Sequence, residues 1–508
     1  MAATATSGAT EHVDVLIVGA GISGIGCAYY LQQHHPQRSF RILEARPRTG
    51  GTWDLFRFPG IRSDSDVHTF GFEFKPWVSE NAIAGGAEIL AYIREAAREN
   101  GIDQHIRTNH RVVSLSWSSA DARWYATIER PGALPLRLSA DWIFAATGYF
   151  RYDAGYLPEL PGLQNFAGRV VHPQNWPHDL DYEGKRVVVV GSGATAVTLV
   201  PALAEQAAHV TMLQRSPSYI MSLPRRDPLA VKLQQWLGPE RGYEWARRKN
   251  IALQTGLYRF CQRYPQQARK LIRRLTIKQL PEGYPVDLHF KPRYDPWDQR
   301  LCFAPSGDLF CAMREGTASV ATDRIETFTA GSVRLASGEE LEADIIVTAT
   351  GLRLQAFGAI EFEVDGQRVD ITKKVAFRGM MLDGIPNFAF LIGYTNASWT
   401  LKVGLVCEHF CKLLAHVDEL GADTCAVELP YPHMPTRPLL SFKAGYVQRA
   451  LHQLPRQGMQ SPWELAMSFR TDKRVLRDAP VEHRNLHFSR VRELEPADQV
   501  LTATSSIV

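Results

Sequence analysis

The hydrophobic pattern of the chain predicts two sets of buried parallel strands, each followed by a helix. Val13–Val18 and Arg186–Val190 are short, almost continuous apolar runs, as in strands covered on both faces. Each run leads into a glycine-rich turn and then into a helical pattern. Second strands are expected at Ser39–Leu43 and His209–Leu213. This order is typical of βαβ units, so the sequence predicts an α/β fold with two Rossmann-like dinucleotide-binding domains.

Further patterns suggest how these domains are built into the chain. Apolar and polar residues alternate at Arg111–Ser118 and at Trp124–Glu129, which predicts a small group of antiparallel strands there. An apolar-periodic helix is expected at Leu401–Leu414. We therefore expect a first part of the first dinucleotide-binding domain at 1–150, the second dinucleotide-binding domain at 151–343 with a helical insertion at about 223–290, the second part of the first domain at 344–430 and a wrapping tail at 431–508.

The first glycine-rich turn has the surroundings that a dinucleotide site requires. Gly19, Gly21 and Gly24 form G-x-G-x-x-G between strand and helix, with Ser23 inside the motif. These glycines permit the tight turn, the approach of a pyrophosphate and close helix packing. Glu44 ends the second strand, where a carboxylate accepts hydrogen bonds from a ribose hydroxyl and repels a 2′-phosphate. The turn therefore suits FAD.

The second turn differs from the first at the end of its second strand. Arg215 and Ser216 stand close to where the first unit has an acid, and a guanidinium there can pair with a 2′-phosphate. The contrast favours FAD in the first domain and NADPH in the second. The residues expected at the second turn are Gly191, Ser192, Gly193, Ala194, Thr195, Ala196 and Val197.

Two further strands end in the same three residues. Asp141–Gly148 and Asp344–Gly351 both finish in Ala-Thr-Gly and bracket the second glycine-rich turn. Such strands commonly mark where the chain passes between the halves of a flavoprotein with two dinucleotides. We expect the two crossings between domains at these points.

Composition narrows the class of protein. The chain of 508 residues is too long for one core, and 45% apolar with 22% charged residues is ordinary for a globular protein. A net charge of +4 does not imply a nucleic-acid partner. Seven cysteines without a C-x-x-C pair fit a reducing compartment. The N-terminal apolar run is too short for a signal peptide or membrane span, so a cytoplasmic protein is expected. No metal site is expected.

The segment before the second turn fits neither a good strand nor a helix. Gly168 and two prolines interrupt FAGRVVHPQNWP, yet it carries an imidazole and a large aromatic. Its spacing F-x-G-x-x-x-H-x-x-x-W-P resembles the fingerprint of the Baeyer–Villiger monooxygenases, flavoenzymes that insert one oxygen atom beside a carbonyl. The resemblance makes this segment the joint between domains, coupling NADP binding to closure through its fingerprint residues: Phe166, Gly168, His172, Trp176 and Pro177.

A second segment, GGTWDLFRFPGIRSD at 50–64, is similar to another pattern of the same family. The resemblance extends over about residues 11–490. It implies that Val112 lies against the adenine. It also places other residues along the FAD or near the flavin and nicotinamide: Thr52, Trp53, Asp54, Leu55, Arg62, Ser63 and Asp64.

One arginine receives a catalytic role from the resemblance. On local sequence Arg300, flanked by two carboxylates, reads as structural, but family members carry their catalytic arginine before a Leu or Pro at this point. In that chemistry NADPH reduces the flavin, O₂ adds to it, and the flavin peroxide attacks a carbonyl. A permanent cation stabilises the peroxide and the developing oxyanion, and Asp64 would orient it. Gln299 replaces a basic residue found in many relatives, which shifts the 2′-phosphate contact towards Arg215.

The segment Tyr394–Thr400 narrows the resemblance further. Together with WDQRLC and the segment 50–64, it looks like the ethionamide-activating subgroup of these enzymes. Its N-A-S-W also resembles flavin-containing monooxygenases that oxidise sulfur and nitrogen. Asn396 and Trp399 are candidates to line the flavin and NADP pocket.

Several functional readings remain open on the sequence. The leading one is an FAD- and NADPH-dependent Baeyer–Villiger monooxygenase that acts on small lipophilic ketones and also sulfoxidises thioethers or thioamides. An S/N-oxidising flavin monooxygenase is the alternative. A disulfide reductase would need a redox dithiol, and the first part of the FAD domain has only Cys27. The basic insertion is either a solvated face or a surface that meets a membrane or admits lipophilic substrate.

Overall fold

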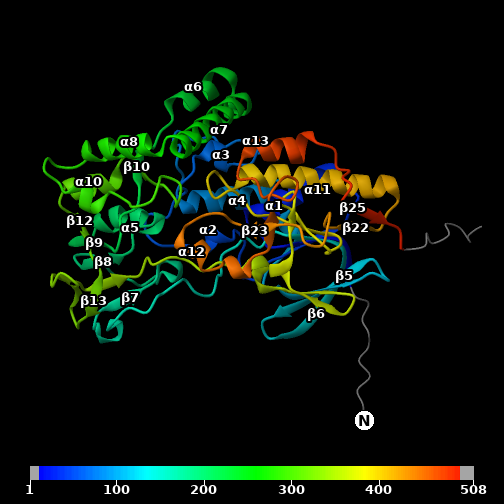
Figure 1. Ribbon diagram of the computed structural model, residues 1–508, viewed down its shortest axis with the longest axis horizontal. Helices are drawn as coiled ribbons and strands as arrows, with labels where there is room; N and C mark the ends of the chain where they lie inside the picture. The colour runs from blue at the N-terminus through cyan, green and yellow to red at the C-terminus, as the bar shows by residue number, and fades with distance from the viewer. Residues whose placement is uncertain (1–10, 492–508) are drawn as a thin grey trace, which may run out of the picture.

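The computed structural model describes residues 11–491 and builds them around two separate sheets (Figure 1). The first sheet has nine strands in the order β18-β17-β4-β5-β6-β1-β2-β3, with β21 paired to β6. The second has five strands in the order β12-β9-β8-β16-β7, and every neighbouring pair is parallel. The expected α/β fold with two Rossmann-like domains is confirmed.

The elements of the first domain come from both sides of the second in sequence. They are β1 (Glu11–Val18), α1 (Ile22–His34), β2 (Phe40–Leu43), α2 (Thr52–Leu55), α3 (Val67–Phe70), α4 (Gly86–Glu99), β3 (Ile106–Arg107), β4 (Arg111–Ser118), β5 (Arg123–Arg130), β6 (Ala133–Ala145), β17 (Glu361–Val364), β18 (Gln367–Val369), β19 (Ala376–Phe377), β20 (Met381–Leu382), β21 (Phe388–Phe390) and α11 (Thr400–Leu420).

The second domain occupies the middle of the chain. Its elements are β7 (Arg169–Val171), β8 (Arg186–Val190), α5 (Ala194–Ala204), β9 (His209–Gln214), β10 (Ile220–Leu223), α6 (Pro228–Leu237), α7 (Pro239–Arg263), α8 (Pro265–Ile277), α9 (Val286–His289), β11 (Cys302–Pro305), α10 (Asp308–Arg314), β12 (Ala318–Thr322), β13 (Ile325–Phe328), β14 (Ser332–Leu335), β15 (Glu340–Glu342) and β16 (Ile345–Val347).

The remaining segment, described as far as residue 491, returns over the first domain. It contains β22 (Thr424–Val427), β23 (Thr436–Pro438), α12 (Gly445–Gln448), β24 (Arg456–Gly458), α13 (Phe469–Asp472), a π-helical turn (Lys473–Asp478) and β25 (Leu486–Ser489). Arg477 ties it down with ion pairs of 2.8 Å to Glu73 and 2.6 Å to Glu408. No helix within residues 11–491 is long and apolar enough to cross a membrane.

Strand β1 shows why the first sheet forms. Its apolar residues alternate between faces, as the period of a strand requires. Val15 and Ile17 belong to a core cluster that contains residues of α1 and α11, whereas Leu16 and Val18 belong to a cluster with β4, β5 and β6. Both faces are therefore covered, which explains the near-continuous apolar run in the sequence.

Strand β16 modifies the expected domain limits. We predicted that the second FAD part begins at residue 344, but Ile345–Val347 pairs in parallel with both β7 and β8. The second sheet thus includes this strand, and the chain leaves that domain only after the second Ala-Thr-Gly. β7 itself lies in the segment that fitted neither strand nor helix, and β16 is its only partner in the sheet order of the described residues.

The two crossings between domains lie side by side. An antiparallel bridge joins Phe150 to Leu354, and the Arg151 N–H donates to the carbonyl of Arg353 at 2.8 Å. The Gln355 N–H donates to the carbonyl of Tyr149 at 2.9 Å. The two connections therefore form one short ribbon instead of two independent linkers.

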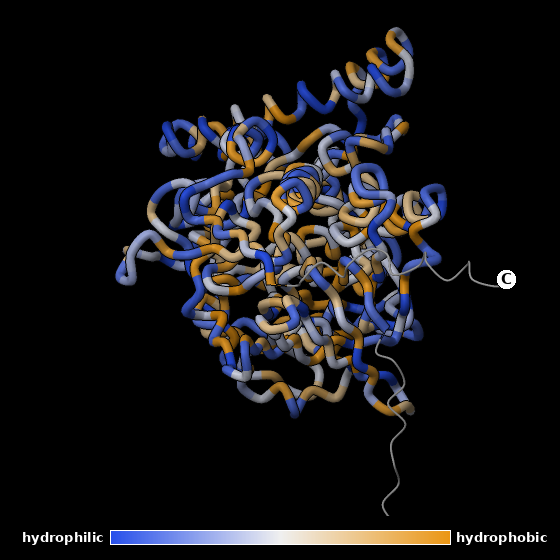
Figure 2. Tube along the Cα trace, turned by 90° about the vertical axis from the view of Figure 1, so that its right-hand side faces the viewer, coloured by the Kyte–Doolittle hydropathy of each residue, from blue (hydrophilic) through white to orange (hydrophobic). Residues whose placement is uncertain are grey.

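The helical insertion is confirmed as α6, α7 and α8, and it touches both domains. The α6–α7 hairpin projects from the body in Figure 1, and the same projection mixes apolar and polar residues in Figure 2. Arg247 of α7 is buried and donates at 2.8 Å to the carbonyls of His68 and Gly71, at the α3 segment of the first domain. The insertion thus braces one domain against the other.

Candidate active site

The two glycine-rich turns are built in the same way. Gly19 has φ +108°, and a Cβ there would lie 2.6 Å from the carbonyl oxygen of Ala146. Gly191 has φ +139°, and its Cβ would lie 2.3 Å from the carbonyl oxygen of Ala349. Each first glycine therefore packs against the first residue of an Ala-Thr-Gly. The repeated sequence device is a repeated contact, which excludes any larger residue at either turn.

The helix starts above both turns fit the phosphates of a dinucleotide. Gly21 caps α1 and Gly193 caps α5, and neither cap provides a side chain to satisfy the first N–H groups. A Cβ on Gly193 would meet nothing within 4 Å, and one on Gly24 would lie 1.9 Å from the Gly19 carbonyl oxygen. Free N–H groups at a helix start bind a pyrophosphate. Ser23, Ala194, Thr195, Ala196 and Val197 lie in the first turns of these helices.

The residues that follow β2 and β9, Glu44 and Arg215, have the opposite charges that the sequence analysis relied on. Glu44 is buried, and its carboxylate accepts from the Ala20 N–H at 2.9 Å and the Arg46 N–H at 3.0 Å. Burial raises the pKa of Glu44 in spite of these two donors. Arg215 and Ser216 are exposed where β9 ends. The first end is thus suited to hydroxyl groups and the second to an anionic phosphate.

The second turn is held to the end of β9 by serines. The Ser192 hydroxyl donates to the carbonyl of Ser216 at 3.1 Å and lies 3.0 Å from the hydroxyl of Ser218. Of the other arginines near Arg215, Arg226 forms an ion pair of 3.5 Å with Glu80. Arg215 is therefore a better-placed candidate than Arg226 for the 2′-phosphate.

The segment 50–64 runs from the first turn to the second domain. Gly51 lies against Gly21, since its Cβ would approach the Gly21 Cα to 3.2 Å. Further along, a Cβ on Gly60 would lie 2.7 Å from Ala202 of α5. Leu55 packs at the edge of the core cluster that contains α5. The segment therefore runs from the first glycine-rich turn to α5 of the second domain.

Within this segment, Asp54 has a structural environment that the sequence did not reveal. Its side chain is fully buried and forms ion pairs with four arginines at 2.7 to 3.2 Å: Arg46, Arg48, Arg57 and Arg94. Burial alone would raise the pKa of Asp54, but these cations lower it below its ordinary value. The carboxylate fixes the loop, while Thr52 lies 3.5 Å from the Tyr152 hydroxyl and Trp53 packs edge-on against Phe70.

Arg62 and Ser63 are also held from both sides. Arg62 forms an ion pair with Asp308, the first residue of α10 in the second domain, and its Nη2 is buried with no partner among residues 11–491. Ser63 is buried and accepts from the Ser65 N–H at 3.0 Å. Val112, near the start of β4, lies in the core of the first domain.

Arg300 meets Asp64 at the centre of the site. Arg300 Nη2 lies 2.6 Å from Asp64 Oδ2, and Nη1 donates to the carbonyl of Thr395 at 2.9 Å. Its Nε is buried and has no partner among the described residues. Burial lowers the pKa of Arg300, but Asp64 together with Tyr446 and Tyr149 outweighs burial, so the pKa stands above its ordinary value. The cation is permanent and retains one unused donor.

The carboxylates that flank Arg300 in sequence do not bind it. Asp295 pairs with Arg269 at 2.7 Å, and Asp298 pairs with Lys443 at 3.1 Å. Leu301, the next residue, is fully buried in a cluster under α8. The arginine is therefore directed away from its neighbours in sequence and towards the segment 50–64.

Two tyrosines at this site escaped sequence reasoning. Tyr149 directly follows the first Ala-Thr-Gly, and Tyr446 lies in α12 of the returning C-terminal segment. Burial raises the pKa of both, and both hydroxyls are hydrogen-bonded to one another and lie in the field of Arg300. Position after Ala-Thr-Gly was the one available signal for Tyr149. No sequence signal pointed to Tyr446, because it reaches the site only where the C-terminal segment returns over the first domain.

The Tyr394–Thr400 segment joins this centre to the first turn. The Trp399 Nε1–H donates to the Ser23 hydroxyl at 2.9 Å, and the Trp399 ring lies 5.2 Å from that of Tyr149. The Asn396 amide donates to the carbonyl of Met467 at 2.9 Å, whereas its Oδ1 is buried and unpartnered within residues 11–491. Unused polar atoms on Asn396, Arg62 and Arg300 fit a polar cofactor, because buried polar groups are rarely left unpaired.

The fingerprint residues anchor the second domain and fasten the crossings. Phe166 belongs to a core cluster with Val188, and Trp176 packs at a different cluster with Val187. A Cβ on Gly168 would lie 2.3 Å from the Asp344 carbonyl oxygen. Pro177 ends the segment with its carbonyl accepting from Leu180. Glycine is thus required where β7 meets the start of β16.

His172 reaches the ribbon of crossings. Its Nε2 donates to the carbonyl of Gly351 at 3.2 Å, while Nδ1 accepts from the Gln174 N–H at 3.1 Å. The Gln174 amide in turn donates to the carbonyls of Arg151 and Tyr152 at 3.0 and 3.1 Å. Burial lowers the pKa of His172, so the ring is neutral. Both ring nitrogens of His172 are thus engaged by backbone atoms, one of them at the second crossing.

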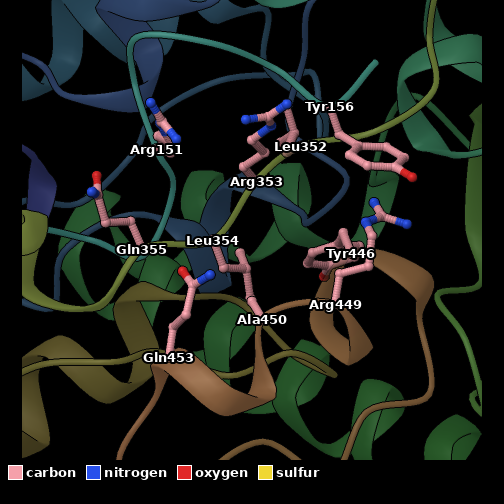
Figure 3. Close-up of a pocket in the computed structure, with 10 residues that line it drawn as sticks. All are labelled: Arg151, Tyr156, Leu352, Arg353, Leu354, Gln355, Tyr446, Arg449, Ala450 and Gln453. Carbon is pink, nitrogen blue, oxygen red and sulfur yellow. The ribbon is translucent and has the colours of Figure 1, made fainter. Parts of the chain in front are cut away.

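A cavity of about 250 Å³ opens beside this ribbon (Figure 3). Both crossings and the returning segment line it, with Arg151, Arg353, Arg449 and Tyr446 among its walls. The Arg449 guanidinium stacks 3.5 Å from the centre of the Tyr156 ring. Through Tyr446 the cavity adjoins the surroundings of Arg300.

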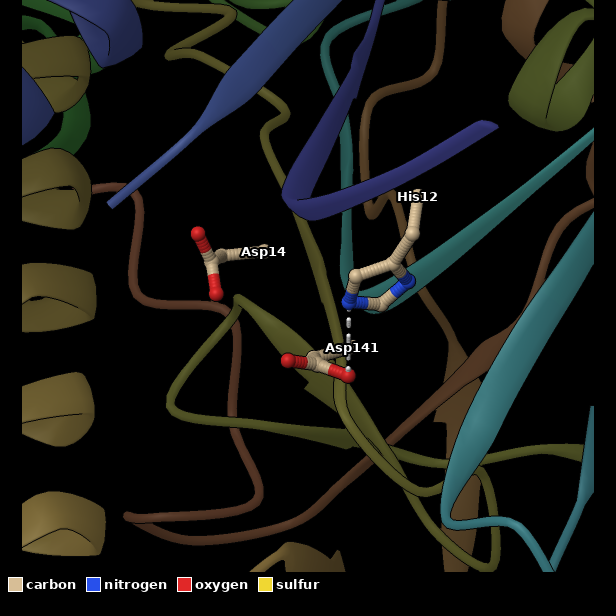
Figure 4. A group of neighbouring side chains, drawn as sticks. All are labelled: His12, Asp14 and Asp141. Atoms are coloured by element: carbon tan, nitrogen blue, oxygen red, sulfur yellow. Dashed lines mark ion pairs between the residues drawn. The ribbon is translucent and has the colours of Figure 1, made fainter. Parts of the chain in front are cut away.

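Among the described residues, one group of side chains has the types and spacing of metal ligands (Figure 4). His12, Asp14 and Asp141 place their ligand atoms within 4.8 Å of one another. Asp14 accepts from the Ser39 N–H at 2.6 Å, and His12 lies 3.0 Å from the Ser139 hydroxyl. These atoms are used within the sheet, and the group lies at the opposite end of β1 from the glycine turn.

The cysteines of the first domain form a buried group that the sequence did not reveal. Cys407 and Cys411 of α11 interact with Cys27 of α1, and none of the three is in a disulfide. Burial raises the pKa of the Cys27 thiol well above its ordinary value. A redox dithiol needs a thiolate that forms readily, so these residues serve packing.

Similarity to known proteins agrees with this geometry. The pyridine nucleotide-disulphide oxidoreductase family matches residues 16–228. The FAD-containing monooxygenase EthA of Mycobacterium tuberculosis is 52% identical over 482 residues, covering 95% of this chain and 98% of the relative. The chain belongs to the FAD-containing monooxygenases. This confirms the predicted enzyme class and its FAD cofactor.

Comparison with solved structures shows which fold this FAD-containing monooxygenase has. An open cyclohexanone monooxygenase matches with a TM-score of 0.74 and 18% identity, covering 94% of this chain and all of the other. An oxidised steroid monooxygenase bound to NADP matches with a TM-score of 0.73 and 22% identity, with the same coverage. The FAD-containing monooxygenase therefore has the fold of Baeyer–Villiger enzymes.

Proposed function

We propose that this FAD-containing monooxygenase takes its electrons from NADPH and inserts oxygen beside the carbonyl of a lipophilic ketone. The products are an ester or a lactone, and thioethers or thioamides are oxidised at sulfur by the same site. The observation that carries the proposal is the Arg300–Asp64 pair of 2.6 Å, which holds a partly buried cation whose Nε–H has no partner among the described residues. Bound FAD, once reduced, supplies the oxygen-transferring chemistry.

Arg300 has the charge and the donors that oxygen insertion into a carbonyl needs. Negative charge develops on the carbonyl oxygen during addition, and a fixed cation in a dry site stabilises it. Arginine cannot act as a general acid, since it stays protonated. Thr395 and Asp64 fix two directions of the guanidinium, which leaves Nε–H to face a reacting group.

Two buried tyrosines stand beside this cation. Tyr149 and Tyr446 lie in the field of Arg300, and burial keeps their pKa values above the ordinary value. Both therefore remain protonated near neutral pH and do not serve as bases. Arg215 at the end of β9 would hold the 2′-phosphate of NADPH, as its exposure and charge suit.

The second candidate is an S/N-oxidising flavin monooxygenase with little activity on ketones. The N-A-S-W motif that ends at Trp399 favours this candidate, because it resembles the motif of those enzymes. The Trp399 N–H donates to the Ser23 hydroxyl beside the first glycine-rich turn. That chemistry requires a protonated, electrophilic oxidant and hence less help from a cation. The Arg300–Asp64 pair favours the ketone reading instead.

A substrate comparison on the FAD-loaded enzyme tests the proposal. A linear ketone, a cyclic ketone and a thioether would be supplied with NADPH or NADH, and product would be measured against nucleotide consumed. We expect ester, lactone and sulfoxide with NADPH, and much less of each with NADH. Sulfoxide without any ester or lactone would favour the second candidate.

A further inference from the structure

The insertion formed by α6, α7 and α8, with the short α9 that follows it, is rich in exposed large hydrophobic residues. Ten of the eighteen exposed large hydrophobic residues within 11–491 lie between residues 229 and 288. Trp236 is 73% exposed, Leu253 62% and Trp245 53%. Single exposed leucines are normal, but exposed tryptophans gathered with leucines on one element mark an interaction surface.

The same insertion carries a large net positive charge. Residues 223–290 contain fourteen Arg and Lys against five Asp and Glu, a net charge of +9, whereas the whole chain has +4. The remaining residues are therefore net negative. On α8 the exposed Lys270 and Arg274 alternate with the exposed Leu271 and Leu275. Arg248 lies 5.5 Å from the ring of Trp245.

The outer face of these helices is not needed to hold them in place. The inner face of α7 is anchored by the buried Tyr243, which donates to the carbonyl of Phe72 at 3.0 Å, and by Arg247. Ala268 and Ile272 of α8 pack in a cluster with Leu301. The exposed aromatic, aliphatic and basic residues lie outside these contacts, so folding gives no reason for them.

We propose that the outer face of α6, α7 and α8 docks this protein on the surface of an anionic lipid bilayer. Helices that lie in a membrane interface combine Trp and Leu with Lys and Arg in this way. Basic residues attract anionic headgroups, while the tryptophans and leucines enter the region beneath them. A nucleic acid would satisfy the charge but gives no reason for exposed aliphatic residues.

The position of this face relative to Arg300 gives docking a consequence. Leu301, the residue after Arg300, is buried beneath α8, so the docking face stands directly behind the site. On the proposed function, lipophilic ketones that partition into a bilayer would reach the enzyme there. Docking itself does not rest on that function, and its test does not use oxygenation.

Sedimentation with lipid vesicles tests docking directly. The FAD-loaded protein would be mixed with phosphatidylcholine vesicles with and without phosphatidylglycerol, and the bound fraction measured as salt is raised. We expect binding only where phosphatidylglycerol is present, and release by salt, because screening weakens the attraction. No binding to the anionic vesicles at low salt would overturn the proposal.

Matched variants identify the face. Lys270→Glu with Arg274→Glu, and separately Trp236→Ser with Leu253→Ser, are expected to lower the vesicle affinity about tenfold or more. Leu134→Ser is the control, since Leu134 is 83% exposed on β6, outside the insertion. Equal binding by all four proteins would overturn the assignment, as would variants that change only the oligomeric state measured by light scattering.

Discussion

Arg300 Nη2 lies 2.6 Å from Asp64 Oδ2, although 236 positions separate the two residues in the chain. The pair joins the second domain to the loop that begins at the first glycine turn. Asp295 and Asp298, which precede Arg300 in the sequence, are engaged instead by Arg269 and Lys443. Two carboxylates next to the arginine in sequence are thereby removed from competition.

Replacement of Asp64 tests what the pair contributes. Asp64→Ala leaves Arg300 charged but less well oriented, and the loss of one charge-assisted hydrogen bond is worth about 1.5–3 kcal/mol. We expect ketone oxygenation to fall by about tenfold to a hundredfold. FAD content, measured by absorbance, should not change. An unchanged rate with full FAD content would contradict a role in orienting Arg300.

Arg215 decides between the two nicotinamide nucleotides. Removing its charge in Arg215→Gln should raise the KM for NADPH by about tenfold to a hundredfold, since a phosphate loses its charged partner. The KM for NADH should barely move. Arg226→Gln is the matched control, because Arg226 already pairs with Glu80. Equal effects of both substitutions on NADPH would refute the assignment to Arg215.

His172 is expected to act on domain position. His172→Ala removes the contact with the Gly351 carbonyl, worth about 1 kcal/mol, and loosens Gln174 against the first crossing. Oxygenation should fall severalfold while FAD stays bound. Steady-state rates and the flavin spectrum together check this outcome. His178→Ala, at an exposed position directly after this segment, should leave both unchanged. Loss of FAD from the His172 variant would count against the role.

Stability should depend on pH through His409. Its Nε2 accepts from Arg378 at 2.8 Å and its Nδ1–H donates to the Leu476 carbonyl at 2.7 Å. Burial and the Arg378 cation lower its pKa from 6.5 to about 3. The unfolded chain therefore binds a proton below about pH 6.5 that the folded chain does not. The free energy of unfolding should therefore decrease as the pH is lowered below about 6.5.

Denaturant titrations between pH 7 and pH 5 measure that slope. Each pH unit below about 6.5 should remove about 1.4 kcal/mol through this one group. His409→Gln cannot take up the proton, so its free energy of unfolding should fall less steeply over the same range. Identical slopes for the two proteins would show that His409 is not the responsible group.

Much of the fold followed from local sequence because its signals are local. Buried strands, glycine turns and Ala-Thr-Gly ends are each set by a few adjacent residues, and β8 spans the predicted residues. The limit at residue 344 was harder to predict, because a short apolar strand has the same pattern in either sheet. β16 is placed by its pairing with β7 and β8, which is a long-range relation.

The features of the site that the sequence analysis did not predict also depend on long-range contacts. Asp54 has the residue type of a cofactor contact, but four arginines gathered from Arg46 to Arg94 enclose it. Tyr446 comes beside Arg300 only because the C-terminal segment returns over the first domain. Such contacts depend on how distant segments pack, which periodicity and motif spacing do not contain. Arg300 and Asp64 were found because the family pattern carries both.

The most direct test of the central claim is the amount of ester formed per NADPH oxidised by Arg300→Ala, compared with the unaltered enzyme on the same ketone. We predict that the variant keeps its FAD and still oxidises NADPH, but forms almost no ester and releases the oxygen as hydrogen peroxide. Arg300→Lys should recover little, because one ammonium cannot replace the contacts with Asp64 and Thr395 together. Ester formation by Arg300→Ala at the unaltered ratio to NADPH would contradict the account.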